Sequence, residues 1–234
     1  MKNHPEHSAL LQFDSLNNQA GIAHFVTTRK GGVSKGPFSS FNMGNYSDDC
    51  SIDIYENRQT DKIEALYGID ASITHLKDLF ICATTADCVP ILLYDKKLQI
   101  IAAIHAGWKG IVGNIIENTI AKMKEAYNTN PSHIVAAIGP SISQKNYEVG
   151  DELITEFNKS GFDLSSATLF NQQTNKWHID LKLVSHNELV RLGVVPNQIE
   201  TSTLCTYDES ELFFSARRQT IVSGRMLSGI KLID

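Results

Sequence analysis

The sequence is poor in cysteine and has no clustered basic segment, and these absences exclude several classes of protein. Only 4 of its 234 residues are cysteine, which is too few for a disulfide scaffold of this length. No CxxC motif occurs, so a zinc ribbon and a thioredoxin-type redox motif are excluded. The net charge of −5 argues against nucleic acid and against anionic lipid as partners, since both need a basic face.

Long apolar stretches are also lacking. Runs such as Ile100–Ile104 are far too short to cross a bilayer, which argues against a membrane protein. The first fifteen residues lack the basic start and the apolar stretch of a signal peptide. No repeat and no Pro/Gly/Ser-rich linker divides the chain. We therefore expect a cytoplasmic protein with reduced thiols and one domain over residues 1–234.

Apolar patterns predict an α/β fold. Buried strands are expected at 21–28, 79–84, 89–94, 98–104 and 134–138. One helix is predicted from about Val112 to Tyr127, and a second over Leu183–Leu192, closed by Gly193. The glycine-rich stretch 30–44 is expected to be a loop. Strands alternating with helices favour α/β architecture, and hairpins between the strands favour mixed sheets.

The segment 84–110 brings a cysteine and a histidine together. Two apolar strands flank Asp95–Leu98, a connection of ordinary hairpin length. With the turn centred in this connection, Cys88 lies opposite His105, with Cβ atoms about 4.5–5.5 Å apart. The two side chains could then hold one zinc ion or form a thiolate–imidazolium nucleophile. The alternative is a buried cysteine beside a hydrogen-bonded core histidine.

The neighbours of this pair favour a cavity over a packed core. His105 is followed by Ala-Gly-Trp-Lys-Gly, whose glycines permit close approach of the backbone. Pro90 removes a ladder donor just after Cys88, so the strand is irregular or at an edge there. Asp87 points to the opposite face of its strand, and we expect it to orient a neighbour and not to bind the same ion.

Two other regions are candidate binding elements. Arg29 precedes Gly31 and Gly32, and its charge and that backbone could hold phosphate or a ribose oxygen. The alternative is an exposed arginine at the start of a loop. Trp108 could stack on a flat base or phenol, or could fill the core.

The sequence resembles the YfiH-type family, also called the laccase-domain or polyphenol oxidoreductase family. The resemblance rests on ten short motifs in family order across nearly the whole chain. They are TTRKGGVS (27–34), FNMG (41–44), ENR (56–58), TADCVP (85–90), HAGWKG (105–110), IGPSI (138–142), YEVG (147–150), CTY (205–207), FFSARR (213–218) and SGR (223–225). Each motif is weak alone, and together they are highly specific.

The resemblance implies a compact α/β fold similar to the catalytic fold of bacterial Cys/His deamidating toxins. It also implies a zinc site built from one cysteine and two histidines. Two ligands carry over to matching positions, Cys88 of TADC and His105 of HAGW. Arg29 of TTR is implied to line the same pocket.

The motif that supplies the third zinc ligand in the family is absent from this chain. The family places this ligand in a Gln-x-His-Gly motif after ENR, and no such motif occurs in this chain. A few tens of residues are missing near 59–61. Either the gene lost this loop or the sequence omits a segment, and omission is favoured because the other motifs are intact. His75 is the nearest substitute in sequence, at a position with no family role.

Several reactions remain open. The resemblance implies zinc-dependent phosphorolysis of adenosine, inosine, guanosine and methylthioadenosine, with nucleoside and phosphate as partners, and adenosine deamination in some members. A four-copper laccase site is excluded, because the chain has 8 histidines and no HxH pair. Copper at Cys88 and His105 could still oxidise phenols weakly.

Two alternatives come from other classes of protein. One is a metal-free Cys88/His105 amidase, supported by the toxin-like fold and by a proposed family role in editing serine from peptidoglycan precursors. The other is a non-catalytic binding module, if the third ligand is lost. The sequence does not fix the oligomeric state.

Overall fold

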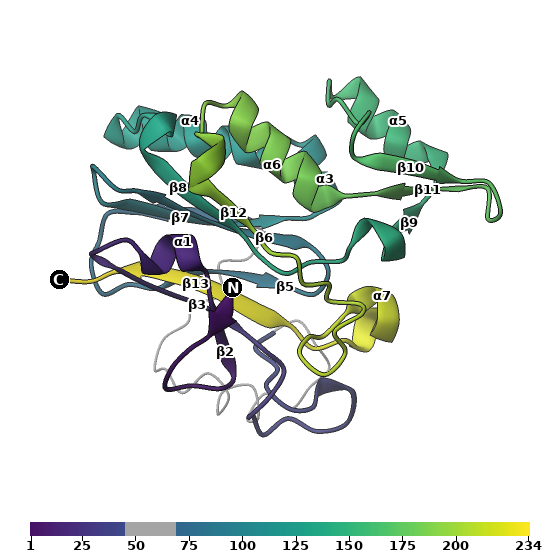
Figure 1. Cartoon of the computed structure of the whole chain (residues 1–234), viewed down its shortest axis with the longest axis horizontal. Helices are drawn as coiled ribbons and strands as arrows, with labels where there is room; N and C mark the ends of the chain where they lie inside the picture. Colours follow the sequence, from purple (N-terminus) through teal and green to yellow (C-terminus); the bar gives the residue numbers. More distant parts are fainter. Residues whose placement is uncertain (45–68) are drawn as a thin grey trace.

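Two five-stranded sheets form the centre of the computed structural model, which describes residues 1–44 and 69–234. The first sheet is antiparallel throughout, in the order β1-β2-β3-β13-β5. Its strands are β1 (Lys2–Asn3), β2 (Leu10–Gln12), β3 (Ile22–Thr27), β13 (Met226–Leu232) and β5 (Ile81–Thr85). The strand nearest the C-terminus therefore lies between two strands from the first half of the chain (Figure 1).

The second sheet is mixed, in the order β12-β8-β6-β7-β4. Its strands are β12 (Ile199–Thr201), β8 (Ile134–Ile138), β6 (Val89–Asp95), β7 (Ile100–Ala106) and β4 (Ala71–Thr74). Strand β12 runs parallel to β8, and the other neighbours are antiparallel. The predicted mixed sheet built on a hairpin is thereby confirmed.

Helices cover one face of the second sheet, and the first sheet covers its other face (Figure 1). The covering helices are α4 (Ile115–Tyr127) and α6 (Leu181–Arg191), and the short α3 (Trp108–Val112) precedes α4. Other short helices are α1 (Asp14–Asn17) and α7 (Ala216–Gln219). Within the described residues, no helix has the length and apolar character that spanning a bilayer requires.

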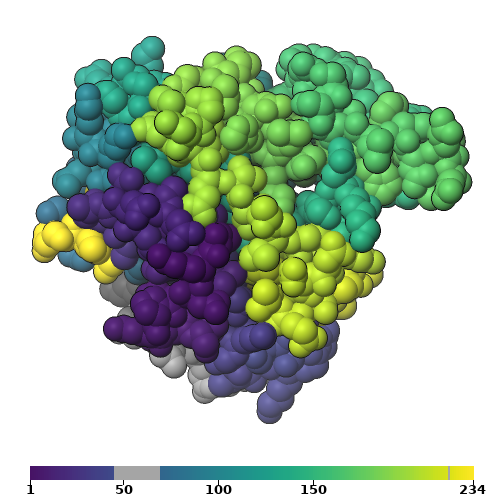
Figure 2. Space-filling view, viewed as in Figure 1, coloured from purple at the N-terminus to yellow at the C-terminus, as the bar shows by residue number. Residues whose placement is uncertain are grey.

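A third, antiparallel sheet lies at one side of the molecule with helix α5 (Asp151–Lys159). Its strands, in order, are β10 (Thr168–Asn171), β11 (Lys176–Ile179) and β9 (Glu148–Val149). The β10–β11 hairpin projects from the body of the molecule (Figure 2).

Strand β6 forms the centre of the core because both of its faces are buried. Ile91 and Leu93 pack in the cluster on the helix side of the sheet, and Leu92 and Tyr94 pack in the cluster between the two sheets. All seven residues of β6 are buried. This explains the uninterrupted apolar run in the sequence, since a strand covered on both faces shows no polar alternation.

The predicted elements are present, with shifts of one to three residues at most of their ends. The strand predicted at 134–138 is β8. Helix α6 begins two residues before its prediction, because the Asp180 carboxylate caps it by accepting from the Leu183 N–H at 3.0 Å. The helix predicted from Val112 is divided, since Asn114 adopts a left-handed conformation between α3 and α4.

The predicted register of the β6–β7 hairpin is wrong by two positions. His105 lies opposite Pro90, and Asp95 pairs with Ile100, so the connecting residues are 96–99. The Asp95 carboxylate accepts from the N–H groups of Lys97 and Leu98, which keeps Asp95 at the end of the strand. Gln99 closes the turn in a left-handed conformation with a φ of 55°. This local turn chemistry moved the centre of the hairpin by one residue.

Two features of the sequence lie outside the described residues. They are the ENR motif at 56–58 and the apparent missing loop near 59–61.

A buried histidine predicts acid sensitivity of the fold. His24 is 4% exposed, and its Nε2 accepts from the Phe13 N–H at 2.9 Å. Burial lowers the pKa of His24 to about 4, so the unfolded chain binds a proton at higher pH than the folded one. The free energy of unfolding is expected to fall by about 3 kcal/mol as the pH decreases from about 6.5 to about 4.

Urea unfolding at several pH values measures this effect. The variant His24→Gln removes the titrating group. Its free energy of unfolding is therefore expected to depend less on pH than that of the wild type within that pH window. His75→Gln, at an exposed histidine, is the matched control. Equal pH slopes for wild type and His24→Gln would contradict the assignment.

Candidate active site

Cys88 and His105 meet at the end of the β6–β7 hairpin, over Gly107. Continued by one residue beyond the paired strands, the observed register sets Cys88 opposite Gly107, with His105 diagonally from Cys88 on the same face. A Cβ atom at Gly107 would lie 3.1 Å from Cys88 Sγ and 3.7 Å from His105 Nε2. The missing side chain of Gly107 therefore provides the space in which thiol and imidazole approach each other. The predicted pair is brought together, although by a different register.

The surroundings of His105 favour the charged form of its imidazole. Hydrogen bonding to the Cys88 sulfur raises the pKa of His105 to about 9, and the carboxylate of Asp70 adds to this effect. Burial acts in the opposite direction on the pKa but is outweighed. Without a metal ion, the imidazole is therefore held as the cation beside the sulfur at neutral pH.

Asp70 is a member of this group that the sequence did not reveal. Its Oδ1 lies 2.8 Å from His105 Nδ1, and its carbonyl oxygen accepts from the His105 N–H at 2.7 Å. A carboxylate only accepts, so Nδ1 carries the hydrogen and Nε2 faces Cys88. Asp70 directly precedes β4, the edge strand beside β7, and only this strand pairing places it next to His105. Its side chain is 56% exposed, so its role is to orient the ring more than to stabilise the fold.

A wall of aromatic and cationic side chains borders the pair. The Arg217 guanidinium lies over the Tyr147 ring at 5.0 Å and donates to the Glu148 carbonyl at 3.0 Å. Burial, followed by the charge of Cys88, raises the pKa of Tyr147 to about 12, so the phenol remains protonated. Tyr147 belongs to the YEVG motif, and Arg217 belongs to FFSARR. The structure thus joins motifs that lie some 70 residues apart in the sequence.

Arg225 of the SGR motif also belongs to this region. Burial lowers its pKa, while the charges of Cys88 and Asp87 favour the cation. Its Nη1 donates to the Ser223 and Gly224 carbonyls. Its side chain packs on Gly44, where an added Cβ would lie 2.5 Å from Arg225 Cγ. The sequence signal for Arg225 was the SGR motif, and the residues themselves indicated no role for it.

The structure places Arg29 in a different environment. Its Nε and Nη2 donate to the Ser39 carbonyl, and its Nη1 donates to the Ser210 carbonyl. Its guanidinium also lies over the Phe214 ring, and burial lowers its pKa. Arg29 therefore fixes the loop that follows β3. A direct role for Arg29 in phosphate binding stays a prediction.

The other predicted binding residues lie on two segments. Gly31 adopts a φ of 84°, and the Gly32 N–H donates to Ser40 Oγ, so both belong to the loop that Arg29 holds. Trp108 is the first residue of α3 and packs partly against the helix-side core. Lys109 Nζ lies 5.6 Å from the centre of the Trp108 ring.

Two residues that the sequence left open have structural partners. His75 is exposed, and its Nδ1 lies 3.3 Å from the Tyr127 hydroxyl. The buried Cys205 of CTY accepts from the Ser143 N–H at 3.3 Å and from Asn146 Nδ2 at 3.4 Å. The Cys205 thiol thus holds the segment that directly follows the IGPSI motif. The sequence alone did not indicate this role of Cys205.

The donor set at Cys88 suits a thiophilic metal in part. Cysteine sulfur and histidine nitrogen are zinc ligands, and a carboxylate on the second ring nitrogen is the usual support for a zinc-bound histidine. Among the described residues, no three Cys, His, Asp or Glu side chains form a metal-binding group. The third ligand that the family resemblance implies is therefore not found in residues 1–44 and 69–234.

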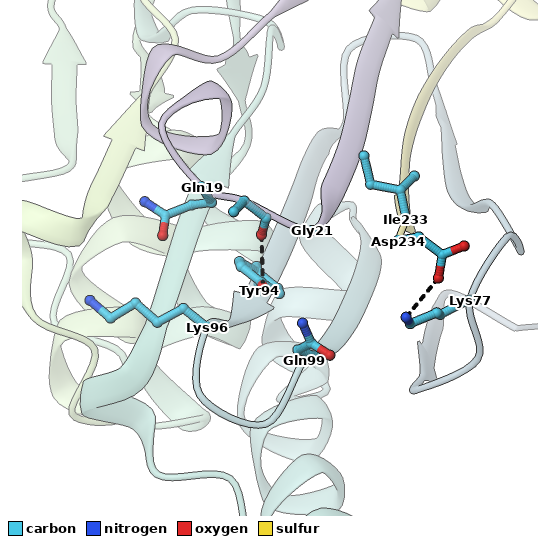
Figure 3. Close-up of a pocket in the computed structure, with 9 residues that line it drawn as sticks. Gln19, Gly21, Lys77, Tyr94, Lys96, Gln99, Ile233 and Asp234 are labelled. Atoms are coloured by element: carbon cyan, nitrogen blue, oxygen red, sulfur yellow. Dashed lines mark hydrogen bonds and ion pairs between the residues drawn. The ribbon is translucent and has the colours of Figure 1, made fainter.

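A separate pocket of about 400 Å³ lies at the turn end of the β6–β7 hairpin, about 20 Å from Cys88 by strand length. Figure 3 shows its lining residues, which come from the loop before β3, the segment between β4 and β5, the β6–β7 hairpin and the C-terminus. Lys77 pairs with Asp234 at 2.8 Å, and the Tyr94 hydroxyl donates to the Ala20 carbonyl at 3.1 Å. Lys96 Nζ donates to Gln198 Oε1. Lys77, Tyr94 and Lys96 thus each have a hydrogen-bond partner.

Comparison with known proteins identifies the family. A family model described as multi-copper polyphenol oxidoreductase laccase matches residues 23–65 and 59–233. The chain belongs to this family. The resemblance inferred from the ten motifs is thereby confirmed.

Relatives of this chain include a purine nucleoside phosphorylase and an adenosine deaminase. A purine nucleoside phosphorylase of Bacteroides thetaiotaomicron is 39% identical over 259 residues, covering 95% of this chain and 96% of that protein. Adenosine deaminase RL5, from an unknown prokaryotic organism, is 44% identical over 166 residues, covering 71% of this chain and 63% of that protein. The crystal structure of the Bacillus licheniformis hypothetical protein YfiH superposes with a TM-score of 0.88 at 28% identity, covering 98% of each chain. The mixed α/β fold is therefore that of the family.

Gly107 offers a direct test of the site geometry. In Gly107→Ala the new methyl group would crowd the Cys88 sulfur at 3.1 Å and separate it from the imidazole. Alkylation of Cys88 by iodoacetamide in metal-free protein is expected to slow by about tenfold, because the sulfur loses its hydrogen bond with the His105 imidazole and the new methyl group crowds it. Peptide mass spectrometry reads the modification at Cys88 alone.

Gly110→Ala in the same motif is the matched control. A Cβ at Gly110 would make ordinary contacts of 3.5–3.8 Å. Equal alkylation rates at Cys88 in the Gly107 and Gly110 variants would show that the space over Gly107 does not govern the thiol.

Proposed function

We propose that this protein is a zinc-dependent purine nucleoside phosphorylase. Its substrates would be adenosine, inosine, guanosine or methylthioadenosine, together with phosphate. The observation that carries the proposal is the meeting of Cys88 and His105 over Gly107, in a chain whose full-length relative at 39% identity is named purine nucleoside phosphorylase. Adenosine deamination is a second reaction of the same site, supported by the relative named adenosine deaminase.

Cys88 and His105 would hold the metal ion. The Asp70 carboxylate supports this by fixing hydrogen on Nδ1 of His105, which leaves Nε2 free as a ligand. A zinc ion bound there would supply Lewis-acid polarisation. Copper in the same donors remains the alternative, with weak phenol oxidation as its reaction.

The side chains around the pair would bind the substrates. The Arg225 cation has Nε and Nη2 without a partner among the described residues, and its charge interacts with the Cys88 sulfur. We therefore assign phosphate binding to Arg225, with Arg29 and Gly31–Gly32 shaping the neighbouring loop. Phosphate held by Arg225 would face C1′ of the ribose, where charge develops as the glycosidic bond breaks. The protonated Tyr147 and Trp108 are candidates for contact with the base.

The third ligand would come from a segment that this sequence lacks near 59–61. Two findings support an omitted segment. The family model matches in two pieces that meet at 59–65, and the alignment to the Bacteroides thetaiotaomicron protein spans 259 residues although this chain has 234. Such an enzyme would act in the cytoplasm on small molecules.

Substitution of the pair tests the proposal. Cys88→Ala and His105→Ala are expected to abolish adenosine phosphorolysis in zinc-replete protein, because each removes a metal ligand. The measurement is chromatography of adenine, ribose 1-phosphate and inosine after incubation with adenosine and phosphate.

Another cysteine and another histidine of the chain provide the control substitutions. Cys82→Ala and His75→Ala remove a thiol and an imidazole away from the site and are expected to keep wild-type turnover. Full activity in both Cys88→Ala and His105→Ala would show that the reaction occurs elsewhere.

A second candidate function has a specific observation in its favour. Cys88, His105 and Asp70 stand in the order nucleophile, base and orienting carboxylate, as in Cys–His–Asp hydrolases. The sulfur could attack an amide directly, without a metal. The metal-free amidase hypothesis explains the contact of Asp70 with His105 as well as the zinc hypothesis does.

Inhibitors separate the two functions. A zinc-dependent phosphorylase is expected to lose turnover in a chelator and regain it with zinc, because Cys88 and His105 would hold a metal that supplies Lewis-acid polarisation. A thiol amidase would resist the chelator and lose activity to iodoacetamide. Amide hydrolysis that survives the chelator, with no nucleoside turnover at any zinc level, would overturn the phosphorylase proposal.

A further inference from the structure

The residue before the reactive cysteine is held in an unusual conformation. Asp87 has a φ of 85°, in the left-handed region that non-glycine residues seldom occupy, and the residue is 8% exposed. Three residues, Ala86 to Cys88, separate β5 from β6. The direction in which Cys88 leaves this turn depends on the Asp87 backbone, and contacts elsewhere must offset the local strain.

The Asp87 carboxylate makes those contacts. Its Oδ1 accepts from Thr206 Oγ1 at 2.6 Å, and its Oδ2 accepts from Ser215 Oγ at 3.0 Å and from the Arg217 N–H at 2.6 Å. The Asp87 carbonyl accepts from the Ile142 N–H at 3.1 Å. Three donors satisfy the buried charge, which would otherwise be costly.

The same carboxylate organises the wall beside the thiol. Arg217, whose N–H it binds, lies over the Tyr147 ring and donates to the Glu148 carbonyl. Asp87 therefore joins the Cys88 backbone on one side to the Arg217–Tyr147 stack on the other. The sequence motifs TADC, CTY and FFSARR converge on this one side chain.

We propose that Asp87 is a positioning residue that acts as a hydrogen-bond clamp. Its carboxylate holds the turn that aims the Cys88 sulfur at His105 Nε2 and sets Arg217 against Tyr147. Asp87 acts through this geometry and exchanges no proton with the substrate. For its effect on turnover, the proposal rests on the phosphorylase function proposed above.

The contact pattern gives the clamp a distinctive response to substitution. In Asp87→Asn the amide nitrogen can take the Oδ1 position, where the Thr206 hydroxyl can turn to accept from it. The amide oxygen then still accepts from Ser215 and the Arg217 N–H. Asparagine therefore preserves the clamp, although it removes the charge. Asp87→Ala removes all three bonds.

The experiment compares Asp87→Asn with Asp87→Ala. Asparagine is expected to keep kcat within about threefold of wild type, and alanine to lower it by about 10- to 100-fold with little change in KM. The double variant Asp87→Asn/Thr206→Val places a donor against a methyl group and is expected to lose the rescue. Equal loss in Asp87→Asn and Asp87→Ala would overturn the clamp in favour of a role for the charge, and wild-type kcat in Asp87→Ala would overturn any role.

Two readouts need no substrate. The first is the thiolate-to-metal absorption band of protein titrated with Co²⁺ alone, and the second is the rate at which iodoacetamide alkylates Cys88. Both are expected to be unchanged in Asp87→Asn and altered in Asp87→Ala. Thr206→Val alone, which removes one donor, covers the case in which Asp87→Ala does not fold, and is expected to shift both readouts in the same direction.

These readouts separate the two proposals. If the wild type shows no nucleoside turnover, the function proposed above fails, and the cobalt band and the alkylation rate still decide the role of Asp87. If turnover is present and neither readout nor kcat distinguishes alanine from asparagine at Asp87, the clamp alone fails.

Discussion

The pairing of β6 with β7 is the constraint on which the rest of the structure depends. Ile91 and Leu93 of β6 pack toward the helices, and Leu92 and Tyr94 pack toward the first sheet. A slip of one residue would exchange these two faces and disrupt both cores. The register that the core enforces also sets Cys88 opposite Gly107 and diagonal to His105. The Cys88–His105 pair is thus located by the same contacts that stabilise the fold.

Two carboxylates support this pair from opposite sides, and they do so in different ways. Asp70 is exposed and touches the far nitrogen of the His105 ring, so it selects the tautomer and the ring orientation. Asp87 is buried and fully bonded, so it acts on the backbone that carries the thiol. An exposed carboxylate can orient a neighbour at little cost, whereas a buried one persists only because its donors are built into the fold.

Arg29 and Arg225, which belong to two family motifs, differ in what their guanidinium groups contact. Arg29 uses Nε, Nη1 and Nη2 on backbone carbonyls, which is the behaviour of a residue that holds a loop. Arg225 bonds through Nη1 and keeps its charge toward Cys88 and Asp87. A motif shows that an arginine matters to the family, but only the partners of its guanidinium show what it does.

The sequence by itself determined the α/β class, the buried strands, the family, and the identity of Cys88 and His105 as neighbours. These features depend on apolar periodicity and on short motifs, which are local. The sequence placed the hairpin turn one residue early, because the bonds from Lys97 and Leu98 to the Asp95 side chain are not visible as a pattern. It indicated an orienting role for Asp87 but could not name its donors.

Only the tertiary structure decided which distant residues join the pair. Asp70 reaches His105 through the pairing of β4 with β7, and Tyr147, Arg217 and Arg225 arrive from the second half of the chain. The physical reason is that their positions follow from strand order and from the packing of two sheets. Those contacts join residues 35 to more than 100 positions apart, and no local pattern in the sequence records them.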